Sequence, residues 1–215
     1  MVINQKFIDS LLNFGEELSS EVCAIQSKDF STEYKDDSSP LTEADIHSNK
    51  RIREFLFSNT NILTIISEEE KEIPYYLRKS WSYYWLIDPI DGTKEFVKGG
   101  DDFCINIALC NEYGPIFGYV ACPKKRDQYY AIQDRGAFKN GARIHCSRSK
   151  SESIRVVASK SHMNDETKNY INSISENNEV ETLNIGSSLK FCIIAEGSAD
   201  VYPRFGPTME WDTCA

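Results

Sequence analysis

Apolar residues near the start of the chain follow the spacing of an amphipathic helix. They recur at intervals of three and four, at Ile3, Phe7, Leu11, Phe14, Leu18, Val22 and Ile25. Such a stripe more often packs against a protein core than against a membrane or a partner helix. Residues 26–40 are polar and predict a loop. A second helix is expected from Thr42 to about Asn59, because Thr42 and Asp45 have the spacing of a capping box.

Two short apolar runs in the next part of the chain both end in acidic residues. The first, residues 62–66, predicts a buried strand and leads into Ser67-Glu68-Glu69-Glu70. The second leads into Asp88-Pro89-Ile90-Asp91-Gly92-Thr93, which predicts a strand, a tight turn and a helix start. If the two strands are neighbours, Glu68 lies beside Asp88 and Asp91. A solvated turn is the more common use of an acidic cluster at a strand end.

The pattern then changes to short strands separated by turn residues. Strands are expected over 103–110, 116–122, 128–133 and 137–139, and Asn140-Gly141 is a strong hairpin signal. These segments predict an antiparallel meander. Residues 94–102, with Gly99-Gly100, predict a mobile loop beside the acidic motif.

Strands and helices alternate after about residue 145. We expect strands over 155–158, 181–185 and 199–202, with helices over 165–177 and from Gly186-Ser187-Ser188 to Glu196. Such alternation is typical of an α/β layer. The chain therefore predicts two subdomains: an α+β unit with the antiparallel sheet and the acidic motifs over 1–145, and an incomplete α/β unit over 146–215.

The composition fits a globular protein and restricts its partners. The 215 residues are 40% hydrophobic and 27% charged, with a net charge of −9. This charge argues against binding a nucleic-acid polymer, which requires Lys and Arg to neutralise phosphates. A polyanionic small molecule would need a local positive centre, which bound cations would supply. Ordinary solubility is the simpler reason for the acidity.

The cysteines indicate a reducing compartment. Seven are scattered along the chain without C-x-x-C spacing, and several lie inside apolar runs, which makes buried thiols more plausible than disulfides or a zinc site. We therefore expect a cytoplasmic protein, with a peripheral position at the inner membrane face as a further option. No signal peptide and no apolar stretch of membrane-spanning length is visible, so no integral membrane segment is expected.

The paired aspartates suit a hard divalent cation. Mg2+ shares its coordination shell between carboxylates, water and phosphate, and a helix start just beyond offers N–H groups to an anion. Asp88 and Asp91 thus indicate metal-dependent phosphate chemistry, although a polar turn after a buried strand explains them equally well. Asp45 has a capping role available, and His162 and Arg204 taken alone would be ordinary surface residues.

Four elements in order carry a family resemblance: Thr42-Glu43-Ala44-Asp45, Ser67-Glu68-Glu69, Asp88-Pro89-Ile90-Asp91-Gly92-Thr93 and Trp211-Asp212. Through these four elements together, the chain resembles the inositol monophosphatase superfamily of Mg2+-dependent, Li+-sensitive phosphatases over nearly its whole length. Further stretches are similar to its CysQ-type 3'(2'),5'-bisphosphate nucleotidases: Tyr84-Trp85-Leu86-Ile87, Lys94-Glu95-Phe96, Gly186-Ser187-Ser188-Leu189-Lys190-Phe191-Cys192 and Tyr202-Pro203-Arg204-Phe205-Gly206-Pro207-Thr208. The implied fold is the layered αβαβα sugar-phosphatase fold, of mixed α+β and α/β class.

The resemblance also implies a metal centre of two or three Mg2+ ions. Glu68, Asp88 and the Ile90 carbonyl would hold the first ion. Asp88, Asp91 and Asp212 would hold the second. Two metals can share the charge of the attacking and leaving oxygens and activate a water molecule, so no protein nucleophile is required.

The remaining implied roles concern catalysis and the substrate. The backbone N–H groups of Gly92 and Thr93 would bind the scissile phosphate. Asp45 and Thr93, with Glu68 nearby, would polarise the attacking water. The nucleotide and its 5'-phosphate would contact His162, Ser187, Lys190 and Arg204, and a guanidinium suits a second phosphate because its planar fork binds bidentately.

The expected function is therefore a phosphoric monoester hydrolase. It would remove the 3'-phosphate of adenosine 3',5'-bisphosphate to give AMP, and could act on the sulfated form, 3'-phosphoadenylyl sulfate. We expect a small-molecule phosphonucleotide as partner, and a monomer or homodimer. The alternatives are an inositol or sugar phosphate monophosphatase, a non-catalytic nucleotide- or metal-binding remnant, and a structural module.

The chain end departs from the family pattern. Family members continue for some tens of residues past the Trp-Asp motif, through a helix that begins at the aspartate and through further strands. We therefore expect the C-terminal part of the fold to be missing, and Asp212 to lie on a frayed tail instead of at a helix N-terminus. The second metal site would be the part most affected.

Overall fold

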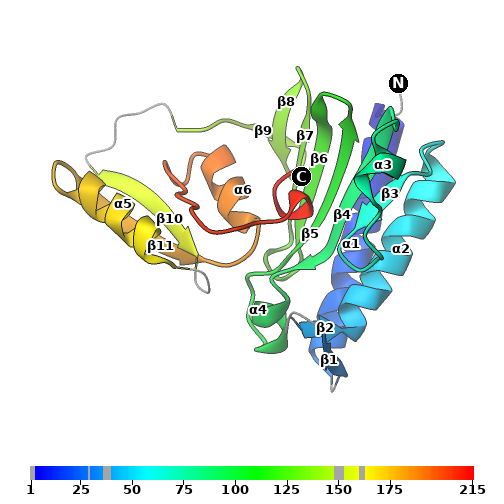
Figure 1. Cartoon of the computed structure of the whole chain (residues 1–215), viewed down its shortest axis with the longest axis horizontal. Coiled ribbons are helices and arrows are strands. Elements are labelled where there is room, and N and C mark those ends of the chain that lie inside the picture. Colours follow the sequence, from blue (N-terminus) through cyan, green and yellow to red (C-terminus); the bar gives the residue numbers. More distant parts are fainter. Residues whose placement is uncertain (1–2, 29, 36–39, 148–152, 160–162) are drawn as a thin grey trace.

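Two long helices cover one face of a seven-stranded sheet (Figure 1). The computed structural model describes residues 3–28, 30–35, 40–147, 153–159 and 163–215. Helix α1 (Gln5–Gln26) begins at Asn4, whose side chain accepts a hydrogen bond from the Phe7 N–H. Helix α2 (Glu43–Asn59) begins at Thr42 with the capping box that its spacing with Asp45 predicts. Both sequence predictions are confirmed, apart from one or two residues at their ends.

The large sheet is a meander with one parallel pair at its edge. Its strands, in spatial order, are β3 (Ile65–Ser67), β4 (Tyr83–Asp91), β5 (Cys104–Asn111), β6 (Gly114–Cys122), β7 (Asp127–Ile132), β8 (Gly136–Lys139) and β9 (Ala142–Ile144). Strands β3 and β4 run parallel and all other neighbours antiparallel. The predicted meander is confirmed, including its last turn, where Asn140 and Gly141 have φ of 48° and 80°.

Alternation along the strands assigns one face of the sheet to the core beneath α1 and α2. Trp85 and Ile87 on β4, and Ile107 on β5, pack with Leu11 and Leu18 of α1 in the main hydrophobic cluster. Successive side chains of a strand point to opposite faces. The intervening residues therefore face the other side of the sheet, where the site described below lies.

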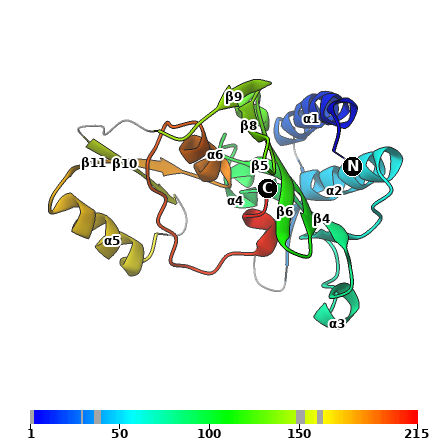
Figure 2. The ribbon, with the colours of Figure 1, turned by 90° about the horizontal axis from the view of Figure 1, so that it is seen from above.

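A second α/β layer lies against that other face. Helix α6 (Leu189–Ala195) packs on the sheet, and beyond it lie the parallel strands β10 (Ser153–Ser159) and β11 (Glu179–Ile185) and then helix α5 (Asp165–Ser175) (Figures 1 and 2). The layers follow the order helix, sheet, helix, sheet, helix. The expected αβαβα fold is confirmed, whereas the division into subdomains at 145/146 stays a prediction.

The differences from the predicted elements are all short. A hairpin of β1 (Thr32–Tyr34) and β2 (Pro40–Thr42) lies in the predicted loop 26–40, and helix α4 (Thr93–Val97) lies at the start of the predicted loop 94–102. The expected strand 199–202 is reduced to one bridge between Val156 and Val201. Additional single turns are α3 (Tyr75–Arg78), η1 (Pro123–Lys125) and η2 (Glu210–Asp212). Elements this short depend on tertiary contacts more than on periodicity.

Within the described residues, no helix combines the length and apolar character that crossing a bilayer requires. All seven cysteines belong to the described residues and are free thiols. Four of them are buried: Cys104, Cys110, Cys122 and Cys192. The expectation of buried thiols thus holds for these four, while Cys146 is exposed.

Candidate functional site

An irregularity in β4 brings its two aspartates to the same face. Asp88 lies opposite Asn106 of β5 and Asp91 lies opposite Cys104, so three steps along β4 match two along β5. In a regular strand, residues three apart point to opposite faces. The one additional residue of β4 between Asp88 and Asp91 turns both aspartates to the same face. Ile90 is buried in the core beneath the helices, while Asp88 and Asp91 face the pocket. Pro89 is tolerated at the irregularity because the ladder needs no N–H there.

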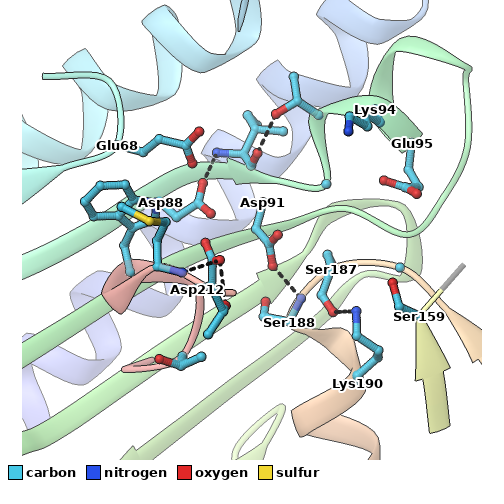
Figure 3. A pocket seen from close by; sticks show the side chains of 18 of the residues that line it. Glu68, Asp88, Asp91, Lys94, Glu95, Ser159, Ser187, Ser188, Lys190 and Asp212 are labelled. Carbon is cyan, nitrogen blue, oxygen red and sulfur yellow. Dashed lines mark hydrogen bonds between the residues drawn. The ribbon is translucent and has the colours of Figure 1, made fainter. Parts of the chain in front are cut away.

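Two further carboxylates join the pair from distant parts of the chain. Glu68 follows β3, which runs parallel to β4, and Asp212 comes from η2 near the chain end. Glu68, Asp88 and Asp212 each place a carboxylate oxygen within 4.8 Å of the others, and Figure 3 shows all of these side chains with Asp91 around one space. The expectation of a frayed tail at Asp212 is wrong, because the side chain of Trp211 packs against the sheet and holds the turn there.

The charges in this cluster repel one another. Burial, and after it the charges of Asp91, Glu68 and Asp212, raise the pKa of Asp88 well above its ordinary value. Burial and the charge of Asp212 raise the pKa of Asp91 to about 6. Among the described residues, buried Asp88 Oδ2 has no hydrogen-bond partner. An unpartnered carboxylate oxygen among like charges fits a divalent cation, which would satisfy the oxygen and relieve the repulsion.

Lys35, a residue that the sequence analysis did not single out, supplies a positive charge at the edge of this cluster. Its Nζ lies 2.9 Å from Glu68 Oε1 and 2.8 Å from Glu69 Oε1. Burial raises the pKa of Glu69 to about 7 although Lys35 opposes the shift. The β1–β2 hairpin places Lys35 here, and a lone lysine in a polar stretch carries no sequence signal for such a role.

The turn after β4 holds Thr93 beside Asp45. Gly92 has φ of 93°, and a Cβ at this position would lie 2.8 Å from the Asp102 carbonyl oxygen, so the turn requires glycine. Thr93 Oγ1 lies 3.0 Å from the Ile90 carbonyl oxygen and 3.4 Å from Asp45 Oδ1. Burial raises the pKa of Asp45, while its hydrogen bonds from Thr42 oppose the shift. Asp45 therefore caps α2 and faces the site at the same time.

The loop between β11 and α6 closes the other side of the pocket. The Gly186 N–H donates to Asp102 Oδ2, the Ser188 N–H donates to Asp91 Oδ2, and Ser188 Oγ donates to Asn106 Oδ1 at 2.7 Å. These bonds fix the loop to the sheet. Asp102 and Asn106 escaped the sequence analysis because each is a single polar residue, Asp102 just before the apolar strand β5 and Asn106 within it.

The same loop presents Ser187 and Lys190 to the pocket. Ser187 has φ of 50°, a left-handed conformation that is uncommon for serine, and its Oγ donates to Cys104 Sγ. Lys190 is 5% exposed, donates to the Ser187 carbonyl oxygen, and lies over the Tyr202 ring at 5.4 Å. Burial lowers its pKa, and the charge of Asp91 opposes the shift. A buried cation thus faces the carboxylates across the pocket (Figure 3).

The pocket encloses about 390 Å³ and collects nearly every predicted site residue. It contains Glu68, Asp88, Ile90, Asp91, Gly92, Thr93, Ser187, Lys190, Arg204 and Asp212. Asp45 lies behind Thr93, and His162 lies outside the described residues. Ser159 and Tyr202 also line the pocket. Tyr202 begins one of the stretches that carried the family resemblance, and Ser159 lies three residues before His162, to which the resemblance assigned a nucleotide contact.

Comparisons with known proteins agree with this geometry. The model of the inositol monophosphatase family matches residues 6–215. The 3'(2'),5'-bisphosphate nucleotidase CysQ of Salmonella typhimurium is 43% identical over 183 residues, covering 84% of this chain and 72% of the relative. The corresponding CysQ of Buchnera aphidicola is 36% identical over 225 residues, covering 97% and 83%.

A solved structure shows the same fold. The crystal structure of CysQ from Bacteroides thetaiotaomicron, described as a bacterial member of the inositol monophosphatase family, superposes with a TM-score of 0.81 at 34% identity. The match covers 93% of this chain and 80% of that one. From the match over residues 6–215, the shared fold and the assembled carboxylates, we conclude that the chain belongs to the inositol monophosphatase family.

Proposed function

We propose that this chain is a Mg2+-dependent 3'(2'),5'-bisphosphate nucleotidase. It hydrolyses the 3'-phosphate of adenosine 3',5'-bisphosphate to AMP and phosphate, and accepts the sulfated form of the nucleotide as a further substrate. The observation that carries the proposal is the meeting of Glu68, Asp88 and Asp212 in one pocket with Asp91 and Lys190. The CysQ names of the relatives at 36–43% identity support the choice of substrate.

The proposed metal ligands are those that the family resemblance implies. Glu68, Asp88 and the Ile90 carbonyl hold one ion, and Asp88, Asp91 and Asp212 hold another; the number of ions, two or three, belongs to the proposal. When bound, Mg2+ supplies positive charge to the phosphate oxygens and lowers the pKa of a water molecule. The buried, unpartnered Oδ2 of Asp88 supports this assignment.

The protein's own groups orient the attack. Asp45 Oδ1 and the Ile90 carbonyl oxygen accept the hydrogen bond of the Thr93 hydroxyl, so the lone pairs of the Thr93 oxygen can accept a hydrogen bond from the attacking water. Glu68, which has a carboxylate oxygen within 4.8 Å of one of Asp88, contributes to the same task. The N–H groups of Gly92 and Thr93, at the turn into α4, bind the scissile phosphate. Positioning and charge therefore perform the catalysis, as phosphoryl transfer requires.

The far end of the pocket suits the remainder of a bisphosphate nucleotide. Lys190 is a buried cation, and Arg204 lies beside it with its Nη2 bonded to the Pro207 carbonyl oxygen at 2.7 Å. Together they offer two positive charges to a 5'-phosphate. Ser187 and, from the family resemblance, His162 complete the proposed nucleotide contacts. We further propose a cytoplasmic location, because the buried free thiols suit a reducing compartment. A monomer or homodimer is also part of the proposal.

Phosphate release from adenosine 3',5'-bisphosphate tests the proposal. The 215-residue chain is expected to release phosphate with Mg2+, to lose this activity with a chelator, and to be inhibited by Li+. Faster turnover of inositol 1-phosphate would show that the chain is an inositol or sugar phosphate monophosphatase. Nucleotide binding by calorimetry without Mg2+-dependent turnover would contradict catalysis and favour a non-catalytic binding protein.

A further inference from the structure

The metal ligand Asp212 lies on an element that cannot hold its position by itself. Turn η2 has three residues and is closed by main-chain hydrogen bonds of 3.2–3.4 Å from Asp212, Thr213 and Cys214. A single 3₁₀ turn has little intrinsic stability. The side chain of Asp212 caps the turn through Thr208 Oγ1 and the Met209 N–H, but these contacts move with the turn. Contacts with the rest of the fold must therefore decide where the carboxylate lies.

Among the described residues, apolar packing on the sheet and one ion pair with α3 both hold η2 in place. Trp211 packs against the small apolar cluster formed by Ile66, Leu86, Ala108 and Cys110. The second contact is polar: Arg78 Nη1 donates to Glu210 Oε1 at 2.6 Å, between residues 132 positions apart. Glu210 is two residues from Asp212, so this ion pair holds the same turn that presents the metal ligand.

Arg78 comes from the connection between the two strands that carry the other ligands. The β3–β4 connection, residues 68–82, begins at Glu68 and leads into the strand of Asp88. Its helix α3 buries no side chain, and Tyr75, Tyr76 and Leu77 are all more than half exposed. Figure 2 shows α3 projecting away from the sheet. Core packing does not explain this helix, whereas the Arg78–Glu210 contact gives it a connection to the site.

We propose that Arg78 is a positioning residue for the metal centre. Through Glu210 it fixes η2, and so holds the carboxylate of Asp212 beside Asp88 and Glu68. The negative charges of Asp212 and Asp88 repel each other, which raises the cost of holding Asp212 in the cluster. The ion pair opposes that repulsion and lowers the cost of gathering the ligands. This role rests on the proposed metal centre and assigns Arg78 no contact with the substrate.

Binding of Mn2+ to the substrate-free chain tests the role of Arg78. The Mn2+ dissociation constant is measured from the electron paramagnetic resonance signal of the free ion. Arg78→Met is expected to weaken binding about threefold to fivefold, the upper range for one partly exposed ion pair. Glu210→Gln should have a similar effect, and the double variant should be no worse than either single one. The exchanged pair Arg78→Glu with Glu210→Arg should recover most of the affinity.

Arg51→Met provides the matched control. Arg51 pairs with Glu21 between α2 and α1 at 3.0 Å, with side chains exposed to nearly the same degree as those of Arg78 and Glu210. Arg51→Met should lower the melting temperature by about as much as Arg78→Met does. It should leave the Mn2+ dissociation constant unchanged. Unchanged Mn2+ affinity in Arg78→Met, or no recovery in the exchanged pair, would overturn the inference. If Asp88→Asn also binds Mn2+ normally, the metal centre itself is wrongly assigned.

Discussion

Thr93 and Asp45, 48 positions apart in the sequence, face each other with Thr93 Oγ1 3.4 Å from Asp45 Oδ1. The threonine hydroxyl also lies 3.0 Å from the Ile90 carbonyl oxygen, and its single proton is shared between the two acceptors. Helix α2 contributes the carboxylate and the turn after β4 contributes the hydroxyl. This contact joins the capping motif of α2 to the aspartate motif.

Removal of the Thr93 hydroxyl tests that contact. Thr93→Ala should lower kcat about 10²-fold, because the water would lose its positioned acceptor. Thr93→Ser keeps the hydroxyl and serves as the control, with kcat expected within about tenfold of the original. Mn2+ affinity should change little in both variants. Equal kcat values for the alanine and serine variants would show that the hydroxyl takes no part in the reaction.

Asp88→Asn should separate metal binding from folding. The substitution removes a ligand shared by both proposed ions, so Mg2+-dependent turnover should fall roughly 10²–10³-fold. It also removes a carboxyl whose charged form is disfavoured by burial and by the charges of Asp91, Glu68 and Asp212. The metal-free variant should therefore melt about 2–4 °C higher for each kcal/mol of relieved repulsion.

Asp134→Asn is the control for Asp88→Asn. Asp134 is exposed and has φ of 62°, a conformation that asparagine also tolerates. This variant should keep both activity and melting temperature. Retained activity in Asp88→Asn would contradict the assigned centre, and a lower melting temperature without metal would contradict the charge argument.

The stability of the metal-free chain should fall as the pH rises through about 6. The folded-state pKa of Asp91 is raised to about 6 from an ordinary value of 3.8, so between these values the folded chain keeps a proton that the unfolded chain releases. This contribution to the free energy of unfolding is full below about pH 4 and is lost as the pH passes 6. Urea unfolding with a chelator present, from pH 4.5 to 7.5, measures it.

Asp91→Asn should flatten that part of the pH profile, since asparagine has no proton to lose. Parallel profiles for the two chains would contradict the raised pKa. In the original chain, the free energy of unfolding falls with pH, whereas the affinity for Mn2+ should rise over the same pH range. The affinity rises because protons compete with the metal for the carboxylates.

Ser188→Ala should loosen the loop that carries Ser187 and Lys190. It removes the 2.7 Å hydrogen bond to Asn106 Oδ1 and keeps the backbone bond to Asp91. KM for adenosine 3',5'-bisphosphate should rise about fivefold, the value of one net hydrogen bond, with kcat within about twofold. Ser198→Ala removes a bond of similar length to Glu196 at the surface and should leave KM unchanged. A loss in kcat alone would place Ser188 in the chemistry instead.

The local elements of the fold were predictable from the sequence because each has a local cause. The stripe from Ile3 to Ile25 predicted α1, the Thr42–Asp45 spacing predicted the start of α2, and Asn140-Gly141 predicted the last hairpin turn of the sheet. The acidic motifs at the ends of two strands placed Glu68 near Asp88, and the structure confirms that those strands are parallel neighbours. Each of these inferences depends on residues a few positions apart.

The rest of the arrangement of the site residues depended on contacts between distant segments and could not be predicted from the sequence. Periodicity alone would place Asp88 and Asp91 on opposite faces, and only the irregular pairing of β4 with β5 brings them together. Lys35 reaches Glu68 because a hairpin forms where the sequence predicted a loop. Asp212 was expected on a frayed tail, yet Trp211 packing and the Arg78–Glu210 pair hold it at the site.

By itself, the sequence therefore determined which carboxylates this chain possesses, the strands and turns that present most of them, and the family to which it belongs. The tertiary structure decided which of those carboxylates share one space and which cations approach them. The physical reason is the sequence distance between the residues that interact. Helix caps, strand alternation and turns are set by neighbours along the chain. The meeting of Glu68, Asp88 and Asp212 depends on sheet register and on contacts between distant segments, such as the Arg78–Glu210 pair across 132 positions.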